Sequence, residues 1–272
     1  MTKIILIFLM ALFAHNAIAE NRDSLKYISD CKYAMQQDVK TFTVGGVSFK
    51  MIRVPEGSFK MGATEEQGIN EYMTEPVNDV HDVTLSSYYI GETEVTQGLW
   101  KAVMGDNPSR VQNGDDYPVD RVSWFDCREF VRKLSEKTGC NFRLPTEAEW
   151  EFAARGGCQG ETKFAGSDYY KEVAWYQENL HGTTHQVATK KPNKLGIYDM
   201  NGNVAEWCAD WFGDYPQTSV INPTGASTGK YRVYRGGSGY DVGSVLQCVA
   251  CRWRTSPSSS DYRIGLRVVL IP

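Results

Sequence analysis

Apolar and polar residues alternate in two segments of the first third of the chain. The first segment covers 42–61 and is interrupted by glycines at 45–46 and by Pro-Glu-Gly at 55–57, and the second, one more strand pair, covers 81–95, ahead of Thr96. Alternation with a period of two is typical of strands that bury one face, and glycine and proline mark the turns between them. We therefore predict short strands joined by turns in both segments.

Three later segments each combine a helix N-cap residue with apolar residues spaced three and four apart. Thr96 begins a predicted helix that ends near 104, and Ser123 begins another over 124–138. A third helix starts at Thr146, where Glu149 completes a capping box, and we interpret its glutamates as helix-dipole partners and surface charge. Glu92 and Glu94 could be ligands, but we expect both to be solvated strand residues.

The segment 196–211, GIYDMNGNVAEWCADW, fits neither period. Oxygen-bearing side chains at 199, 201, 203 and 206 surround Gly202, which permits the positive φ of a tight turn. Calcium binds six to eight such oxygens, although the spacing differs from that of the helix-loop-helix calcium loop. The alternative is a turn whose Asn and Asp side chains bond their own backbone.

The N-terminus has the pattern of an export signal. Lys3 precedes an apolar run at 4–14, and Ala17 and Ala19 form a small-x-small cleavage site. This pattern predicts a signal peptide at 1–19 and an exported chain, periplasmic or secreted, after cleavage near Ala19. No later stretch approaches ~20 apolar residues, so we expect no membrane span.

Composition changes this picture in two ways. A net charge of -4 without a basic face argues against nucleic acid as a partner. Seven cysteines fit an exported protein that contains disulfides, but their odd number leaves at least one thiol unpaired within the chain. They lie at positions 31, 127, 140, 158, 208, 248 and 251.

Four motifs follow one another in the second half of the chain. They are FRLPTEAEWEFAARGG (142–157), LGIYDMNGNVAEWCADWF (195–212), VYRGGS (233–238) and GLR (265–267). In this order they resemble the formylglycine-generating, or sulfatase-modifying factor, family. The resemblance implies a loop-rich α+β fold related to C-type lectins, a single domain with few short helices and strands. We place a lead-in at 20–41 and this domain at 42–272.

The resemblance also implies calcium in the NGNVAEW turn. The ligands carried over are the Asn201 side chain, the Gly202 and Val204 carbonyls and the Glu206 carboxylate. Ligand chemistry and resemblance agree here, so calcium is the cofactor that we predict.

The resemblance fails at the family's catalytic cysteines. Family enzymes oxidise a sulfatase cysteine to formylglycine with molecular oxygen and a copper ion held by two cysteines. The matching positions are Asp241 and Leu246, and counting back from GLR instead reaches Ser244. Copper(I) selects thiolates, so the usual copper site is predicted to be missing.

Cys248 and Cys251 form a Cys-x-x-Cys close to these positions. They are the candidate catalytic residues if a relocated thiol pair binds copper or cycles through a disulfide. A structural role, including a disulfide to another cysteine, is the alternative, because the context is not that of a redox or zinc motif.

Three functions therefore compete. The first is an exported, non-catalytic binding or accessory module for a protein or glycan, including a sulfatase-type polypeptide. The second is a formylglycine-generating oxidase with a shifted cysteine pair, and the third is a lectin-like binding protein diversified by a retroelement. The segment 239–263 is rich in residue types that recognition surfaces use. The predicted binding residues are Tyr240, Asp241, Trp253, Arg254 and Tyr262.

Overall fold

The computed structural model describes residues 38–64, 80–160, 162–241, 249 and 251–272. These residues belong to one compact unit, Asp38–Pro272. The predicted signal peptide at 1–19, most of the lead-in, and Cys31 and Cys248 lie outside the described residues.

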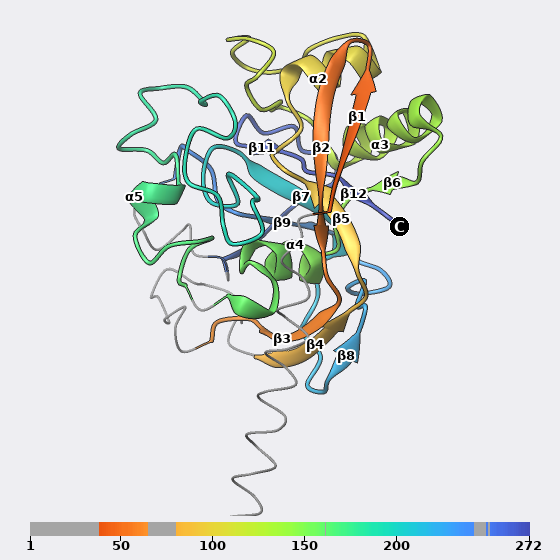
Figure 1. Cartoon of the computed structure of the whole chain (residues 1–272), viewed down its shortest axis with the longest axis vertical. Helices are drawn as coiled ribbons and strands as arrows, with labels where there is room; N and C mark the ends of the chain where they lie inside the picture. Colours follow the sequence, from red (N-terminus) through yellow and green to blue (C-terminus); the bar gives the residue numbers. More distant parts are fainter. Residues whose placement is uncertain (1–37, 65–79, 161, 242–248, 250) are drawn as a thin grey trace, which may run out of the picture. The chain divides into compact units, whose positions relative to one another are not determined.

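The largest sheet has five antiparallel strands in the order β1-β2-β5-β12-β6. Its strands are β1 (Val39–Val44), β2 (Val47–Val54), β5 (Tyr88–Gly91), β12 (Val269–Leu270) and β6 (Phe142–Arg143). The strand nearest the C-terminus, β12, therefore lies between β5 and β6, which come much earlier in the chain (Figure 1).

Two smaller sheets complete the β-structure. The four-stranded sheet has the order β10 (Arg252–Thr255), β9 (Arg232–Arg235), β7 (Ala205–Trp211) and β11 (Ile264–Gly265). The three-stranded sheet contains β3 (Gly57–Met61), β4 (His81–Leu85) and β8 (Val220–Ile221). In Figure 1 the β1–β2 hairpin stands at the top of the domain and β3, β4 and β8 at the bottom.

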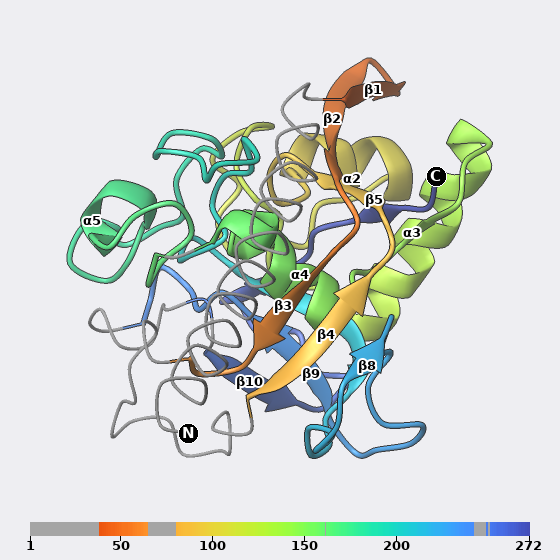
Figure 2. The same ribbon diagram turned by 60° about the horizontal axis from the view of Figure 1, so that its bottom comes forward.

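Helices are few and short. They are α2 (Gln97–Met104), α3 (Trp124–Thr138), α4 (Glu147–Ala154) and α5 (Tyr170–Val173), with a 3₁₀ turn, η3 (Gly157–Gln159). Figure 2 shows α3 and α5 on opposite sides of the domain. No helix in the described part of the chain is both long and apolar enough to cross a bilayer.

The predicted strands and helices at these positions are confirmed. Thr96, Ser123 and Thr146 are the N-caps of α2, α3 and α4, and the last two close capping boxes. Exposed residues alternate with buried ones in β4 and with half-buried or buried ones in β1, as the sequence pattern predicts. The second strand pattern yields β4 and β5, which lie in different sheets rather than paired together.

Three expectations were wrong, and each concerns burial. All eight residues of α4 are buried, so its glutamates are not surface charge. Glu94 is also buried, because the backbone after β5 pairs with the C-terminal segment at Leu266. Finally, 205–211 forms β7 rather than a loop; most of its residues are buried on both faces, which removes the alternation that reveals a strand.

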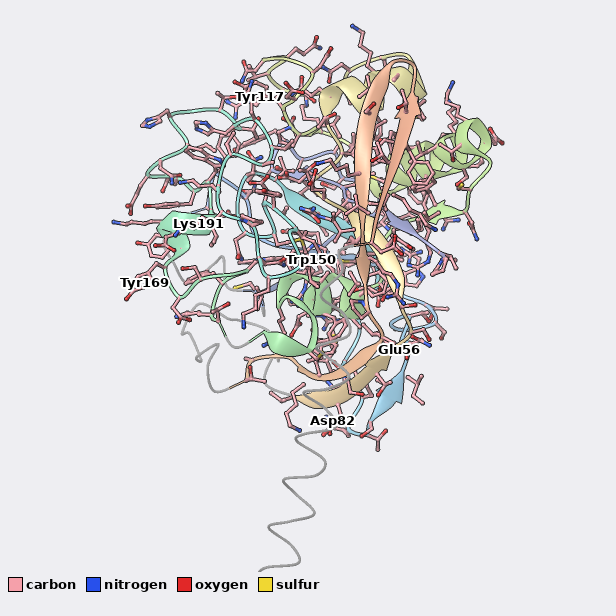
Figure 3. The ribbon with its side chains drawn as sticks, viewed as in Figure 1. Glu56, Asp82, Tyr117, Trp150, Tyr169 and Lys191 are labelled. Atoms are coloured by element: carbon pink, nitrogen blue, oxygen red, sulfur yellow. The ribbon has the colours of Figure 1, made fainter. Side chains whose placement is uncertain are left out.

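The core consists of two large apolar clusters. One lies between α2, α3 and the five-stranded sheet, and the other surrounds α4. Trp150 of α4 is fully buried in the second cluster, and Figure 3 shows it near the middle of the domain. The candidate site is built against this tryptophan.

Candidate functional site

The NGNVAEW turn is held in a strained backbone conformation by its surroundings. Gly202 has φ +77°, and a Cβ placed there would lie 2.0 Å from the Trp175 carbonyl oxygen. Asp199 and Asn203 also have positive φ, at 56° and 55°. Only glycine fits position 202, as the sequence predicted, and the close packing on Trp175 supplies the second reason.

The two asparagines of the turn connect it to distant segments. Asn201 Oδ1 accepts a hydrogen bond from the Ala165 backbone N–H at 2.7 Å. Asn203 bonds both the N–H and the carbonyl of His185, at 3.0 and 3.3 Å. These side chains therefore satisfy the backbone of other loops, rather than that of their own turn.

Glu206 lies at the start of β7 and is fully buried. Its carboxylate accepts three close contacts from the Arg267 guanidinium at 2.8 to 3.1 Å and one from Trp150 Nε1 at 2.7 Å. Arg267 also donates to the carbonyls of Gly91 and Tyr198, at 2.8 and 2.7 Å. Both Glu206 oxygens are thus occupied by protein donors.

Two further buried carboxylates, those of Glu94 and Asp199, interact electrostatically with this ion pair. Glu94 Oε2 and Asp199 Oδ1 have no hydrogen-bond partner within the described part of the chain. Burial, together with the charges of Asp199 and Glu206, raises the pKa of Glu94 well above its usual range, while Arg267 opposes the rise. Burial likewise raises the pKa of Asp199 to about 6. Three acids therefore share one buried arginine, so negative charge is in excess when all three are ionised.

This arrangement fits a hard cation, but with a different donor set from the predicted one. The orphaned oxygens belong to Glu94 and Asp199, whereas those of Asn201 and Glu206 are already bonded. Among the described residues, no three His, Cys, Asp or Glu side chains are arranged as a metal centre. A calcium ion here would therefore also need backbone carbonyls, for which Gly202 and Val204 of the same turn are the candidates.

Four of the predicted binding residues lie in two places: Tyr240 and Tyr262 contact each other, and Trp253 and Arg254 lie on β10. Tyr240 and Tyr262 meet edge to face with centroids 4.9 Å apart, and the Arg110 guanidinium lies 4.4 Å from the Tyr262 centroid. On β10, Trp253 pairs with Tyr234 across the sheet, while Arg254 points to the opposite face and lies 4.4 Å over Phe212. We call Arg110, Tyr240 and Tyr262 the tyrosine patch.

The sequence analysis missed a buried ionic network beneath the RGGS motif. Arg235 forms an ion pair with Glu151, which also binds Arg155 at 2.8 Å. Arg252 binds Glu147 at 2.8 Å. A signal was present, since Glu147 and Glu151 are one helical turn apart and would face the same partners. The network fixes RGGS to α4.

Comparison with known proteins identifies the family of the domain. A model of the "Sulfatase-modifying factor enzyme 1-like domain" matches residues 36–271. The chain belongs to this family. The match begins three residues before β1 and extends past the last strand, so it covers all the helices and strands of the described unit.

Relatives in the family have different names. The chain is 35% identical over 223 residues to the "Chaperone protein LppX" of Paenibacillus barcinonensis, covering 63% of this chain and 75% of that protein. It is 29% identical over 283 residues to the "Formylglycine-generating enzyme" of Streptomyces coelicolor, covering 79% and 87%. Its fold superposes on "Treponema denticola variable protein 1" with a TM-score of 0.77 and 34% identity, over 86% and 99% of the chains.

Asp241, which stands at the position of the family's first copper-binding cysteine, lies within the described residues. Asp241 accepts hydrogen bonds from the backbone N–H and the hydroxyl of Ser238, at 2.7 and 3.0 Å. Its carboxylate therefore closes the turn that follows RGGS. Ser244, Leu246 and Cys248 lie outside the described residues.

The described cysteines do not provide a substitute. Cys251 is 2% exposed and packs with Phe164 and Val173. No disulfide joins any two of the five described cysteines. Two candidate binding features remain from the sequence predictions: the tyrosine patch, and the acidic cluster of Glu94, Asp199 and Glu206, in which Glu94 and Asp199 each keep an oxygen without a partner among the described residues.

Proposed function

We propose that this protein is an exported, non-catalytic binding or accessory member of the sulfatase-modifying factor family, with the tyrosine patch as part of the surface that holds a protein or glycan. The observation that carries the proposal is Asp241. Its carboxylate stands at the copper-thiolate position and is committed to Ser238. A carboxylate is a poor ligand for copper(I), which selects thiolates.

The shifted-cysteine alternative requires two accessible thiols. Burial of Cys251 in an apolar cluster argues against it, because a catalytic thiolate must reach both copper and substrate. Formylglycine-generating activity by Cys248 and Cys251 is therefore our second hypothesis, and the experiment below separates the two.

The tyrosine patch has the composition of a recognition surface. Two tyrosines and an arginine supply rigid, partly apolar contacts and hydrogen bonds, the residue types that dominate binding energies at interfaces. The retroelement hypothesis is supported by the similarity to a protein whose name describes it as variable. Diversification by a retroelement predicts a near-copy of the coding segment for 239–263 beside the gene, which genome sequencing would reveal.

The catalytic hypothesis is tested first. Reduced mature protein, copper and oxygen are incubated with a Cys-x-Pro-x-Arg peptide, and mass spectrometry follows the formylglycine product. We expect no product. A product that disappears in the Cys248→Ser/Cys251→Ser double variant would overturn the proposal and identify the shifted pair as the active site.

The binding hypothesis is tested with glycan arrays and with a sulfatase polypeptide. Tyr240→Ala and Tyr262→Ala should each lower the affinity for any captured ligand by about tenfold or more, as expected for an aromatic anchor. Tyr169→Ala is the matched control, because Tyr169 is 71% exposed and lies beside α5 (Figure 3). Equal loss in all three variants would remove the patch from the proposal.

We further propose that calcium neutralises the acidic cluster and stabilises the domain. Calcium should raise the melting temperature of the wild type, and a chelator should lower it. In Glu94→Gln and Asp199→Asn the calcium response should vanish, while the calcium-free melting temperature should rise because one buried charge is removed.

Glu92→Gln is the control for this test, because Glu92 lies two residues from Glu94 but pairs with Lys50 at the surface. It should keep the full calcium response. A wild-type melting temperature that neither calcium nor chelator changes would refute the calcium proposal.

A further inference from the structure

An arginine is enclosed by two tryptophans between α3 and the four-stranded sheet. The Arg232 guanidinium carbon lies 3.4 Å from the Trp211 ring centroid and 3.8 Å from that of Trp124. Arg128, one turn along α3 from Trp124, lies 5.1 Å from the same Trp124 ring. Two guanidinium groups therefore share one indole.

Neither guanidinium forms an ion pair within the described part of the chain. Arg232 Nη1 donates to the Ala209 carbonyl at 2.6 Å, and its Nε is buried without a partner. Burial and the neighbouring charge of Arg128 lower the pKa of Arg232 to about 10. The pair thus carries positive charge that protein groups do not balance.

The nearby acids are engaged elsewhere. Asp126 bonds the backbone N–H and hydroxyl of Ser123 in the α3 capping box, and Glu129 pairs with Arg132. Asp210 is the acid that acts on Arg232, but burial raises its own pKa to about 8, so it is largely neutral at pH 7. The acids in the described part of the chain therefore form no ion pair with Arg128 or Arg232, and the pair is open to an anion from solution.

We propose that Arg128 and Arg232 form a binding site for an oxyanion, a carboxylate or phosphate group on a ligand that also has an apolar part. Arginine forks match the oxygen spacing of both groups, and stacking between indoles orients Arg232 before the ligand arrives. Phe125 is 55% exposed and meets Trp124 edge to face at 5.7 Å, so it offers the apolar contact.

This site shares no residue with the tyrosine patch or the acidic cluster. Its existence is therefore independent of the proposed function. The two ligand sources, phosphate and carboxylate, have the same hydrogen-bonding chemistry, and separate titrations distinguish them.

The test is calorimetric titration of the mature protein at low salt with inorganic phosphate and, separately, with benzoate. Saturable binding of either ion is expected, and Arg128→Gln should weaken it by about tenfold, since the variant loses the charged hydrogen-bond donor that faces the ion. Arg128 is exposed, so the variant should fold. Binding of benzoate alone would assign a carboxylate ligand, and binding of phosphate alone a phosphate.

Arg132→Gln is the matched control, because Arg132 lies one turn further along α3 and is already paired with Glu129 and Glu136. It should bind both ions within about twofold of the wild type. The proposal is overturned if neither ion binds saturably at up to ~10 mM, a concentration above the weak end of specific affinities. Equal weakening by both variants would overturn it too.

Discussion

At the scale of single residues, Glu206 shows how one side chain connects several parts of the domain. It accepts hydrogen bonds from Arg267 near the C-terminus and from Trp150 in α4. Glu206→Gln should lower the free energy of unfolding by about 3–5 kcal/mol, because it leaves the Arg267 charge buried and unpaired. Urea denaturation of wild type and variant, both without calcium, measures this cost.

Asp82→Asn is the comparison for this prediction, since Asp82 pairs with Lys60 on the surface at 3.0 Å with both side chains exposed. Its effect on unfolding should be small. If Glu206→Gln is no more destabilising than Asp82→Asn, the buried pair does not stabilise the fold.

At the scale of elements, comparing two glycine turns distinguishes the cost of backbone strain from the cost of a steric clash. Gly202 and Gly46 have similar φ values, +77° and +84°, but a Cβ at Gly46 would meet nothing within 4 Å. Gly46→Ala should therefore cost only about 1–2 kcal/mol, the price of a left-handed non-glycine residue. Gly202→Ala should cost clearly more or prevent folding, because its Cβ would collide with the Trp175 backbone. Equal melting temperatures for the two variants would contradict this.

The same elements show what a sequence reveals. The N-caps at 96, 123 and 146 depend on residues within three positions of one another, so local pattern was enough to predict them. The partners of Glu94 and Glu206 come from 56 or more residues away, and no local pattern contains them. The family resemblance supplied the fold, but assigned Glu206 to a metal where the structure pairs it with Arg267.

At the scale of the whole molecule, buried acids make stability depend on pH. Asp210 has a folded-state pKa of about 8, against an ordinary value of 3.8, chiefly because of burial. The folded state therefore keeps a proton that the unfolded chain releases. The free energy of unfolding should fall as pH rises from about 4 to about 8, by up to ~1.4 kcal/mol per pH unit from this group.

Asp210→Asn should flatten this part of the pH dependence, because the amide oxygen can still accept the Glu147 N–H that Asp210 accepts at 2.9 Å. Urea denaturation at pH 5 and pH 8 gives the slope. Asp106→Asn, at an exposed position, should leave it unchanged. An unchanged slope in Asp210→Asn would show that other groups cause the pH dependence.

The position of β12 has a consequence for how the domain folds. Val269 and Leu270 form hydrogen-bonded pairs with β5 on one side and β6 on the other, so the last strand joins segments that were synthesised long before it. The largest sheet cannot close until residue 270 has left the ribosome. During synthesis the open edges of β5 and β6 would be exposed to pairing with other chains, and this interval is when the protein most needs a chaperone.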